Sequence, residues 1–301
     1  MTRKLKVLFS THGLVEGDFA FNTDEKGFII TQVVQKKVIT GQDTGGQVYY
    51  VKALAASSTN YDVDLVTRRV DPRICPQFGG TYKELENDIN YTIEQQWHNS
   101  SKIRSRVLRV PAGGHFMFVP KEDIVPLLPE LIDNLFEFYK KEKQLENIDV
   151  VEGHYRDGML AADMLCTKIQ ETTGRRPVML VTSHSLGHKK YERNLPLYQN
   201  GMISENEWKW HNFEARIAHE KYAFDKADII IATSPDEQRR LLAEPYLQDT
   251  NKITVIPPGY SDEIFSPLSL QEKNKLKHRF EYKDLDGNEK IIDLIGDYLF
   301  S

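Results

Sequence analysis

Cysteine and long apolar runs are scarce in this sequence of 301 residues, and both scarcities narrow the class of protein. Only Cys75 and Cys166 occur, far apart and without metal-ligand spacing, which indicates unpaired thiols in a reducing cytoplasm rather than a disulfide framework. No stretch reaches the roughly 18 apolar residues of a membrane span. The apolar run near the N-terminus is strand-sized and too short for a signal peptide. We therefore expect a cytoplasmic protein that does not enter a membrane.

An excess of positive charge and several common catalytic motifs are also missing. The formal net charge is -5 at pH 7, which offers no basic field to nucleic acid or to an anionic membrane. There is no Gly-x-Ser-x-Gly pattern of a hydrolase and no Gly-x-Gly-x-x-Gly after a strand. The histidines are scattered without the spacing of a metal site. Nucleic acid, a metal and a cofactor are therefore not expected.

Short apolar runs alternate with helical patterns, which is typical of a parallel sheet covered by helices. Strands are predicted over 4–10, 63–67, 106–110, 149–152, 178–182, 229–232 and 252–256. Helices are predicted over 46–57, 121–143, 158–171, 205–225 and 235–242. The fold class is α/β, Rossmann-like, with helices on both faces of the sheet.

Two stretches do not follow this alternation. Residues 19–40 are predicted to form a hairpin or loop, and residues 75–105 are polar, rich in Asn and without a clear period. We interpret both as surface insertions. They are either lids over a cleft or ordinary loops.

The segment Asp43-Thr44-Gly45-Gly46-Gln47 places a glycine pair where a loop turns into an amphipathic helix. Glycine lets the backbone approach an anion, and the N-H groups and dipole of a helix N-terminus favour negative charge. The pair is thus a candidate phosphate site, with a tight turn as the alternative.

Seven further motifs accompany this one. They are Ser10-Thr11-His12-Gly13, Thr67-Arg68-Arg69, Val110-Pro111-Ala112-Gly113-Gly114, Val119-Pro120-Lys121-Glu122, Gly153-His154-Tyr155-Arg156-Asp157-Gly158, Thr182-Ser183-His184-Ser185-Leu186-Gly187 and Val255-Ile256-Pro257-Pro258-Gly259. Together the eight motifs resemble the N-terminal half of the sucrose-phosphate synthase and sucrose synthase group of retaining glycosyltransferases. Mannosylfructose-phosphate synthase belongs to the same group, which is part of family 4 and has the two-domain GT-B fold.

The resemblance implies that residues 1–265 form the acceptor-side Rossmann-like domain. Residues 266–301 would be the connector and the truncated start of the nucleotide-sugar-binding domain, since they are too few for a domain of about 100 residues. The chain is then a domain, a truncated product or a fragment. By itself it is expected to be inactive.

The resemblance also assigns roles to residues near the donor. His184 is the expected catalytic residue, because the family's histidine in this motif lies against the transferred sugar and stabilises charge as the glycosidic bond breaks. A lone histidine at a strand end is otherwise usually structural. The expected donor-binding residues are His12, Gly13, Gly45, Gly46 and Gln47.

The expected acceptor-binding residues are Lys121, His154, Lys190 and Arg216. In members that use a phosphorylated acceptor, a Lys and an Arg at places matching Lys190 and Arg216 bind its 6-phosphate. Ala215 stands where those members often have a second arginine, which weakens the expectation of a phosphorylated acceptor. From the residues alone, Lys190 and Arg216 could instead lie on a solvated helix face, and Lys121 could be a first-turn helix lysine. In the His154 motif, Arg156 and Asp157 could form a surface ion pair or a helix N-cap.

The function that the resemblance implies is transfer of a hexose from a nucleotide sugar, of the UDP-glucose or GDP-mannose type, to fructose 6-phosphate or a related sugar. One alternative is a non-catalytic subunit that binds a sugar phosphate and regulates another enzyme. A second alternative is a nucleotide-sugar epimerase on the same two-domain plan.

Overall fold

The computed structural model describes residues 4–12, 22–23, 29–30, 46–58, 60–70, 93–99, 104–114, 116–259, 279–283 and 289–293. The chain divides into two compact units, Met1–Pro258 and Gly259–Ser301.

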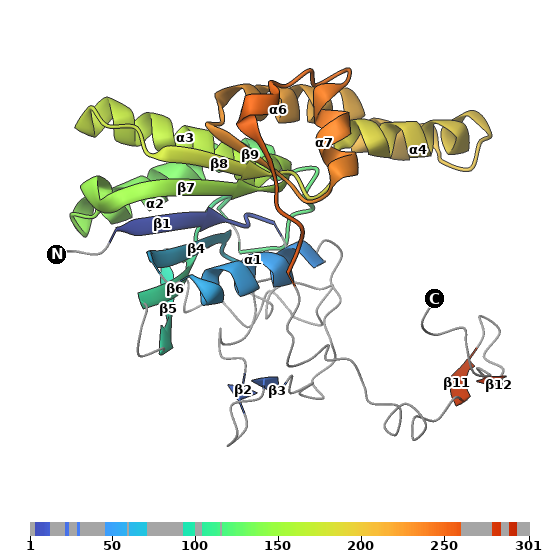
Figure 1. The fold of residues 1–301 in the computed structure, drawn as a ribbon, viewed down its shortest axis with the longest axis horizontal. Coiled ribbons are helices and arrows are strands. Elements are labelled where there is room, and N and C mark those ends of the chain that lie inside the picture. Colours follow the sequence, from blue (N-terminus) through green and yellow to red (C-terminus); the bar gives the residue numbers. More distant parts are fainter. Residues whose placement is uncertain are drawn as a thin grey trace. The chain divides into compact units, whose positions relative to one another are not determined.

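The larger unit is built on a sheet whose described strands run in the order β10-β9-β8-β7-β1-β4-β6-β5 (Figure 1). Neighbouring strands are parallel except for β5, which pairs antiparallel with β6. The bounds are β1 (Leu5–Phe9), β4 (Asp62–Arg68), β5 (Glu94–Asn99), β6 (Arg104–Val110), β7 (Ile148–His154), β8 (Val178–Thr182), β9 (Ile229–Ala232) and β10 (Ile253–Val255). This sheet confirms the predicted Rossmann-like class.

Helices cover both faces of this sheet. Figure 1 shows α2, α3 and α6 on one side and α1 on the other. The helices are α1 (Gly46–Ser57), α2 (Leu128–Lys141), α3 (Tyr155–Thr173), α4 (Gly187–Gln199), α5 (Glu205–His211), α6 (Phe213–Lys226) and α7 (Pro235–Leu242), with 3₁₀ turns η4 (Val125–Leu127), η5 (Leu145–Asn147) and η6 (Thr250–Lys252). Each helix that follows a strand of the parallel sheet returns the chain to the start of the next parallel strand.

The predicted helix 205–225 is two helices, because the chain turns sharply at Asn212. This residue adopts a left-handed backbone conformation, with φ 42°, which asparagine tolerates better than most residues. It ends α5, and its side chain accepts a hydrogen bond from the Ala215 N-H at the start of α6. One residue therefore terminates one helix and caps the next.

Two apolar cores pack against the sheet, one on each face. Consecutive residues of a strand contribute to them in turn. Val7 and Phe9 belong to the large core beneath α2 and α3, whereas Leu8 belongs to the smaller core beneath α1. Successive strand residues point to opposite faces, so one strand serves both layers. Because each face of the sheet is packed, the strand ends that carry the site are fixed in position.

Two motifs singled out in the sequence hold each other. The guanidinium of Arg68, at the end of β4, donates from Nε to the Ala112 carbonyl over 3.1 Å and from Nη1 to the Met117 carbonyl over 2.7 Å. The neighbouring Arg69 lies over the ring of Phe116, 4.4 Å from its centroid. These contacts fix the loop after β6.

Short antiparallel pairs complete the described structure. In the segment predicted as a hairpin or loop, β2 (Asn22–Thr23) pairs with β3 (Ile29–Ile30). In the smaller unit, β11 (Arg279–Lys283) pairs with β12 (Glu289–Asp293). Within the described residues, no helix is both long enough and apolar enough to cross a bilayer.

Candidate functional site

The carboxyl ends of three neighbouring strands bring together residues that are far apart in the sequence. The sheet order places β8, β7 and β1 side by side. His12 follows β1, His154 ends β7, and His184 lies just after β8. Parallel strands all end at one edge of a sheet, and ligands of open α/β folds bind at that edge.

The backbone is strained at two of these strand ends. Tyr155 has φ 65° and His184 has φ 56°, the left-handed region that residues other than glycine seldom adopt. Such conformations cost on the order of 1–3 kcal/mol each and concentrate at functional sites. Lys143, Asn212 and Leu247 share this conformation elsewhere in the described residues, so the strain is consistent with a site at this edge but does not by itself select it.

His184 is half-buried and uncharged at neutral pH. Its Nε2 lies 2.9 Å from Nδ1 of His154, and the ring of Tyr50 on α1 meets it edge to face with centroids 5.0 Å apart. Burial, and then the nearby His154, lowers the pKa of His184 to about 3. A neutral imidazole can donate at one ring nitrogen and accept at the other.

His154 is completely buried, with no exposed side-chain surface. Its Nδ1 faces His184, and its Nε2 lies 3.4 Å from a carboxylate oxygen of Glu152. Burial, and then the charge of Lys6, lowers the pKa of His154 to about 3. This placement suits a residue that supports His184, and the expected direct contact with an acceptor stays a prediction.

His12 is held by Asp157, in the first turn of α3. The His12 Nδ1 lies 2.8 Å from a carboxylate oxygen of Asp157, and the hydroxyl of Thr11 donates to the same oxygen. Burial by itself would raise the pKa of Asp157, but the attraction of His12 and the two hydrogen bonds hold it below its usual value. The carboxylate stays charged and fixes the orientation of the His12 ring.

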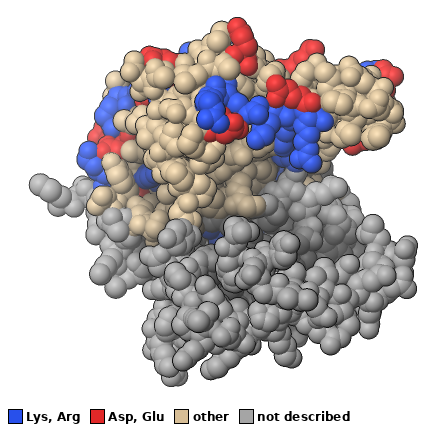
Figure 2. Space-filling model, turned by 45° about the vertical axis from the view of Figure 1, so that its right-hand side comes forward, with Lys and Arg blue, Asp and Glu red and all other residues tan. Residues whose placement is uncertain are grey.

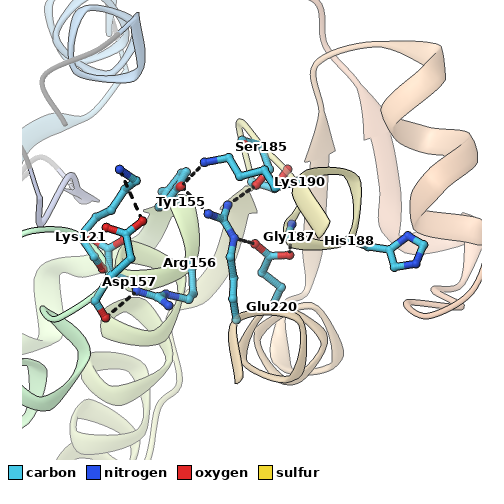
Figure 3. A network of polar contacts seen from close by, with 12 residues as sticks. Lys121, Tyr155, Arg156, Asp157, Ser185, Gly187, His188, Lys190 and Glu220 are labelled. Atoms are coloured by element: carbon cyan, nitrogen blue, oxygen red, sulfur yellow. Dashed lines mark hydrogen bonds and ion pairs between the residues drawn. The ribbon is translucent and has the colours of Figure 1, made fainter. Parts of the chain in front are cut away.

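Two cations donate hydrogen bonds to the hydroxyl of Tyr155 (Figure 3). Lys190 Nζ donates to this oxygen over 2.9 Å, and Arg216 Nη1 donates to it over 2.6 Å. Burial, followed by repulsion from Arg216 and Lys121, lowers the pKa of Lys190 to about 8. The site therefore gathers positive charge where little water reaches it.

Arg216 is held in place by Glu220 and by the backbone of Ser185. Its Nε donates to Glu220 over 2.8 Å and its Nη2 to the Ser185 carbonyl over 2.7 Å, while the second carboxylate oxygen of Glu220 accepts the Gly187 N-H (Figure 3). Gly187 is packed tightly, because an added Cβ would lie 3.0 Å from Arg216 Cγ. The strand-end loop and the guanidinium therefore fix each other.

Lys121 approaches from the loop before η4. Its Nζ lies 3.6 Å from Glu122, and its carbonyl accepts a hydrogen bond from Arg156. Lys121, Lys190 and Arg216 were predicted as acceptor residues. Lys190 and Arg216 meet at Tyr155, which was not predicted, and Lys121 is near enough to help lower the pKa of Lys190.

The predicted donor residues are only partly described. Gly13 and Gly45 lie outside the described residues. Gly46 begins α1, and an added Cβ there would meet nothing within 4 Å. The side-chain nitrogen Nε2 of Gln47, the next residue, is buried without a hydrogen-bond partner among the described residues. Space and an unsatisfied donor therefore occur together at the start of this helix.

Several supporting residues were missed because their signals are faint in sequence. Glu152 is a charged residue inside an apolar strand, and Glu237 is an ordinary first-turn acid of α7. In the structure Glu237 accepts hydrogen bonds from Ser183 and Thr233, which ties the ends of β8 and β9. A charge within a buried strand is a signal that could have selected Glu152.

The described part of the face seen in Figure 2 shows no single dominant charge. On the face seen in Figure 2, Lys and Arg side chains lie beside Asp and Glu side chains. Arg240, for example, pairs with both Asp236 and Glu192. The concentrated positive charge of the strand edge is therefore a local feature.

Comparison with known proteins identifies the family. Residues 44–263, more than half of the chain, match the model of Glycosyltransferase Family 4. The chain belongs to this family of glycosyltransferases.

Two curated relatives are similar over most of the chain. Mannosylfructose-phosphate synthase of Agrobacterium fabrum is 33% identical over 244 residues, which cover 80% of this chain and 46% of the relative. A probable sucrose-phosphate synthase of Thermosipho melanesiensis is 30% identical over 239 residues, which cover 76% and 49%. The chain thus spans about half the length of these relatives.

A solved structure agrees on the fold. Sucrose-phosphate synthase from Thermosynechococcus elongatus superposes with a TM-score of 0.55 and 20% identity, covering 92% of this chain and 54% of that one. The shared fold is Rossmann-like α/β and corresponds to one half of a two-domain GT-B fold.

Proposed function

We propose that this chain is the acceptor-side part of a retaining hexosyltransferase that uses a nucleotide sugar as donor and fructose 6-phosphate or a related sugar as acceptor. Residues 1–265 would form the acceptor-side domain, and residues 266–301 the connector into a nucleotide-sugar-binding domain. The relatives, named as synthases of sugar phosphates, support this class of acceptor.

The observation that carries the proposal is the convergence of Lys190 and Arg216 on the Tyr155 hydroxyl. A phosphomonoester at neutral pH carries nearly two negative charges and three oxygens that accept hydrogen bonds. Arginine presents a planar fork to such a group and lysine a point charge. The described contacts of Arg216 use three of its N-H groups, so two remain of the five that arginine has.

Tyr155 strengthens the fit. Its oxygen accepts hydrogen bonds from both cations, which uses its two lone pairs and leaves its own hydrogen to donate. A phosphate oxygen beside this hydroxyl would accept that hydrogen and approach both cations. Lys121 would add further charge from the opposite side.

In the proposed reaction the acceptor hydroxyl forms a bond to the anomeric carbon as the bond from that carbon to the diphosphate breaks. Attack comes from the face that the diphosphate leaves, and a leaving phosphate oxygen takes the hydroxyl proton, so no protein base is required. The start of α1, with Gly46 and Gln47, would hold the diphosphate. His12 and His184 would line the sugar site and stabilise developing charge.

The test is calorimetric titration of the chain with fructose 6-phosphate and with fructose. We expect the phosphorylated sugar to bind, and a Lys190→Ala/Arg216→Ala double variant to lose at least tenfold in affinity. Lys189→Ala is the matched control, because Lys189 is adjacent in sequence but exposed. Equal affinity for the two sugars, or unchanged binding in the double variant, would contradict the proposed phosphate site.

A second measurement addresses catalysis. The chain is combined with a nucleotide-sugar-binding domain of a family relative, and turnover of UDP-glucose and GDP-mannose is followed with and without fructose 6-phosphate. Transfer that depends on the acceptor supports the proposal. Binding of the sugar phosphate without transfer would favour the regulatory alternative, and donor conversion without any acceptor would favour an epimerase.

A further inference from the structure

A line of buried polar groups crosses the middle of the sheet and ends at His184. Lys6 Nζ on β1 lies 2.6 Å from one carboxylate oxygen of Glu152 on β7. The other oxygen lies 3.4 Å from Nε2 of His154, whose Nδ1 lies 2.9 Å from Nε2 of His184. Glu152 and His154 are 1% and 0% exposed, so their polar groups interact with neighbouring protein groups rather than with water.

The hydrogens on this line can be assigned one group at a time. The ammonium of Lys6 only donates, and an ionised Glu152 only accepts. Neither contact of the Glu152 carboxylate is aligned as a hydrogen bond, and its effect on both neighbours is electrostatic. The negative oxygen beside His154 Nε2 favours a hydrogen on that nitrogen over a lone pair. A neutral imidazole carries one hydrogen, so His154 Nδ1 is left with a lone pair.

The hydrogen on the His184 ring follows from that on His154. Since His154 Nδ1 is an acceptor, His184 Nε2 must be the donor of the bond between the two rings. His184 is then left with a lone pair at Nδ1, on the other side of its ring. Tyr50 meets both rings edge to face, with centroids 5.9 and 5.0 Å away, and restrains their rotation.

We propose that Glu152 and His154 are positioning residues that fix His184 as the tautomer with its hydrogen on Nε2. His184 then presents a hydrogen-bond acceptor at Nδ1. Resting on the proposed function, this acceptor would receive a hydroxyl hydrogen of the transferred hexose, which orients that hydroxyl with its oxygen lone pairs directed elsewhere.

Replacement of Glu152 by glutamine should change which ring nitrogen carries the hydrogen in His154 and His184. Lys6 donates only, so the amide oxygen of the new side chain would face Lys6 and its NH₂ group would face His154. His154 Nε2 must then accept, its Nδ1 must carry the hydrogen, and His184 Nε2 becomes the acceptor. A neutral isostere at position 152 should therefore move the hydrogen of His184 from Nε2 to Nδ1.

The experiment is two-bond ¹H-¹⁵N NMR correlation on this chain with ¹⁵N-labelled histidine, which distinguishes protonated from unprotonated ring nitrogens. The chain has 9 histidines, and the signals of His154 and His184 are assigned from their loss in His154→Gln and His184→Gln. We expect both histidines of the unmodified chain to carry hydrogen on Nε2, and both in Glu152→Gln to carry it on Nδ1.

The matched control is Glu237→Gln. Glu237 is also buried and accepts from Ser183, next to His184, but it is not part of the line from Lys6. We expect the tautomer of His184 to be unchanged in this variant. The same change in both variants would show a general response to lost charge and overturn the proposal.

The unmodified chain also tests the proposal by itself, even if Glu152→Gln does not fold. If His184 of the unmodified chain carries hydrogen on Nδ1, or is a positively charged imidazolium at pH 7, the proposal is wrong. Because this readout needs no sugar and no turnover, it is independent of the proposed function. Failure of sugar-phosphate binding with the expected tautomer would overturn the proposed acceptor and leave this assignment standing.

Discussion

The charge of Lys190 provides a direct pH test of the proposed phosphate site. Its folded-state pKa of about 8, lowered chiefly by burial, means that it loses most of its charge between pH 7 and 9. The charged fraction of Lys190 therefore falls about tenfold over this interval, and the affinity for an anion that needs this charge falls by the same factor. We predict that the affinity for fructose 6-phosphate falls about tenfold from pH 7 to pH 9, measured by calorimetry.

The control for this prediction is Lys190→Arg. Arginine stays charged throughout the interval, so the variant should bind with nearly the same affinity at both pH values. A fall of equal size in the variant and in the unmodified chain would show that a different group titrates.

At the same scale, the sequence selected the charged residues but not the group that joins them. Lys190 and Arg216 were predicted from motifs, because charge is visible in sequence. Tyr155 was not, since its role follows from a left-handed backbone at the end of β7 that places its hydroxyl between two cations. The burial of His154 likewise depends on packing against neighbouring elements, which no local pattern specifies.

At the scale of elements, the tight turn from β7 into α3 depends on Gly153. An added Cβ at Gly153 would lie 2.4 Å from the Gly158 carbonyl oxygen and 2.5 Å from Met159 Cα. Backbone atoms cannot rotate away as a flexible side chain can. We predict that Gly153→Ala forces α3 from the strand and lowers the free energy of unfolding in urea by about 2 kcal/mol or more.

Gly46→Ala is the matched control for that prediction. Gly46 is also a glycine at the start of a helix, but an added Cβ there would meet nothing within 4 Å. We expect its stability to change by less than about 0.5 kcal/mol or to rise slightly, because alanine favours helix. A similar loss in both variants would contradict the steric argument.

Elements were predictable where hydrophobic periodicity was strong. The strands of the parallel sheet are buried on both faces and appear in the sequence as apolar runs, and α1 and α7 have their predicted bounds. The polar edge strand β5 and the helix α4, which contains Pro196, were not predicted. Both lack the apolar periodicity on which such predictions depend.

At the scale of the whole molecule, the buried histidines tie folding to pH. His154 and His184 end or follow the central strands β7 and β8, so they lose their buried surroundings only when the sheet unfolds. Their folded-state pKa values of about 3 lie below the unfolded value of 6.5. The unfolded chain therefore binds more protons between these values, and acid favours unfolding.

The stabilisation from these histidines is fully present above pH 6.5 and declines as the pH falls toward 3. From pH 7 to pH 5 each histidine should cost the fold about 2 kcal/mol, measured as the free energy of unfolding in urea. In His184→Gln the loss over this interval should be about 2 kcal/mol smaller, because the other titrating groups, such as the Asp157 carboxylate, titrate alike in both proteins. An equal pH dependence in the two proteins would mean that His184 is not held neutral by the folded sheet, and the acceptor role assigned to its Nδ1 would lose its physical basis.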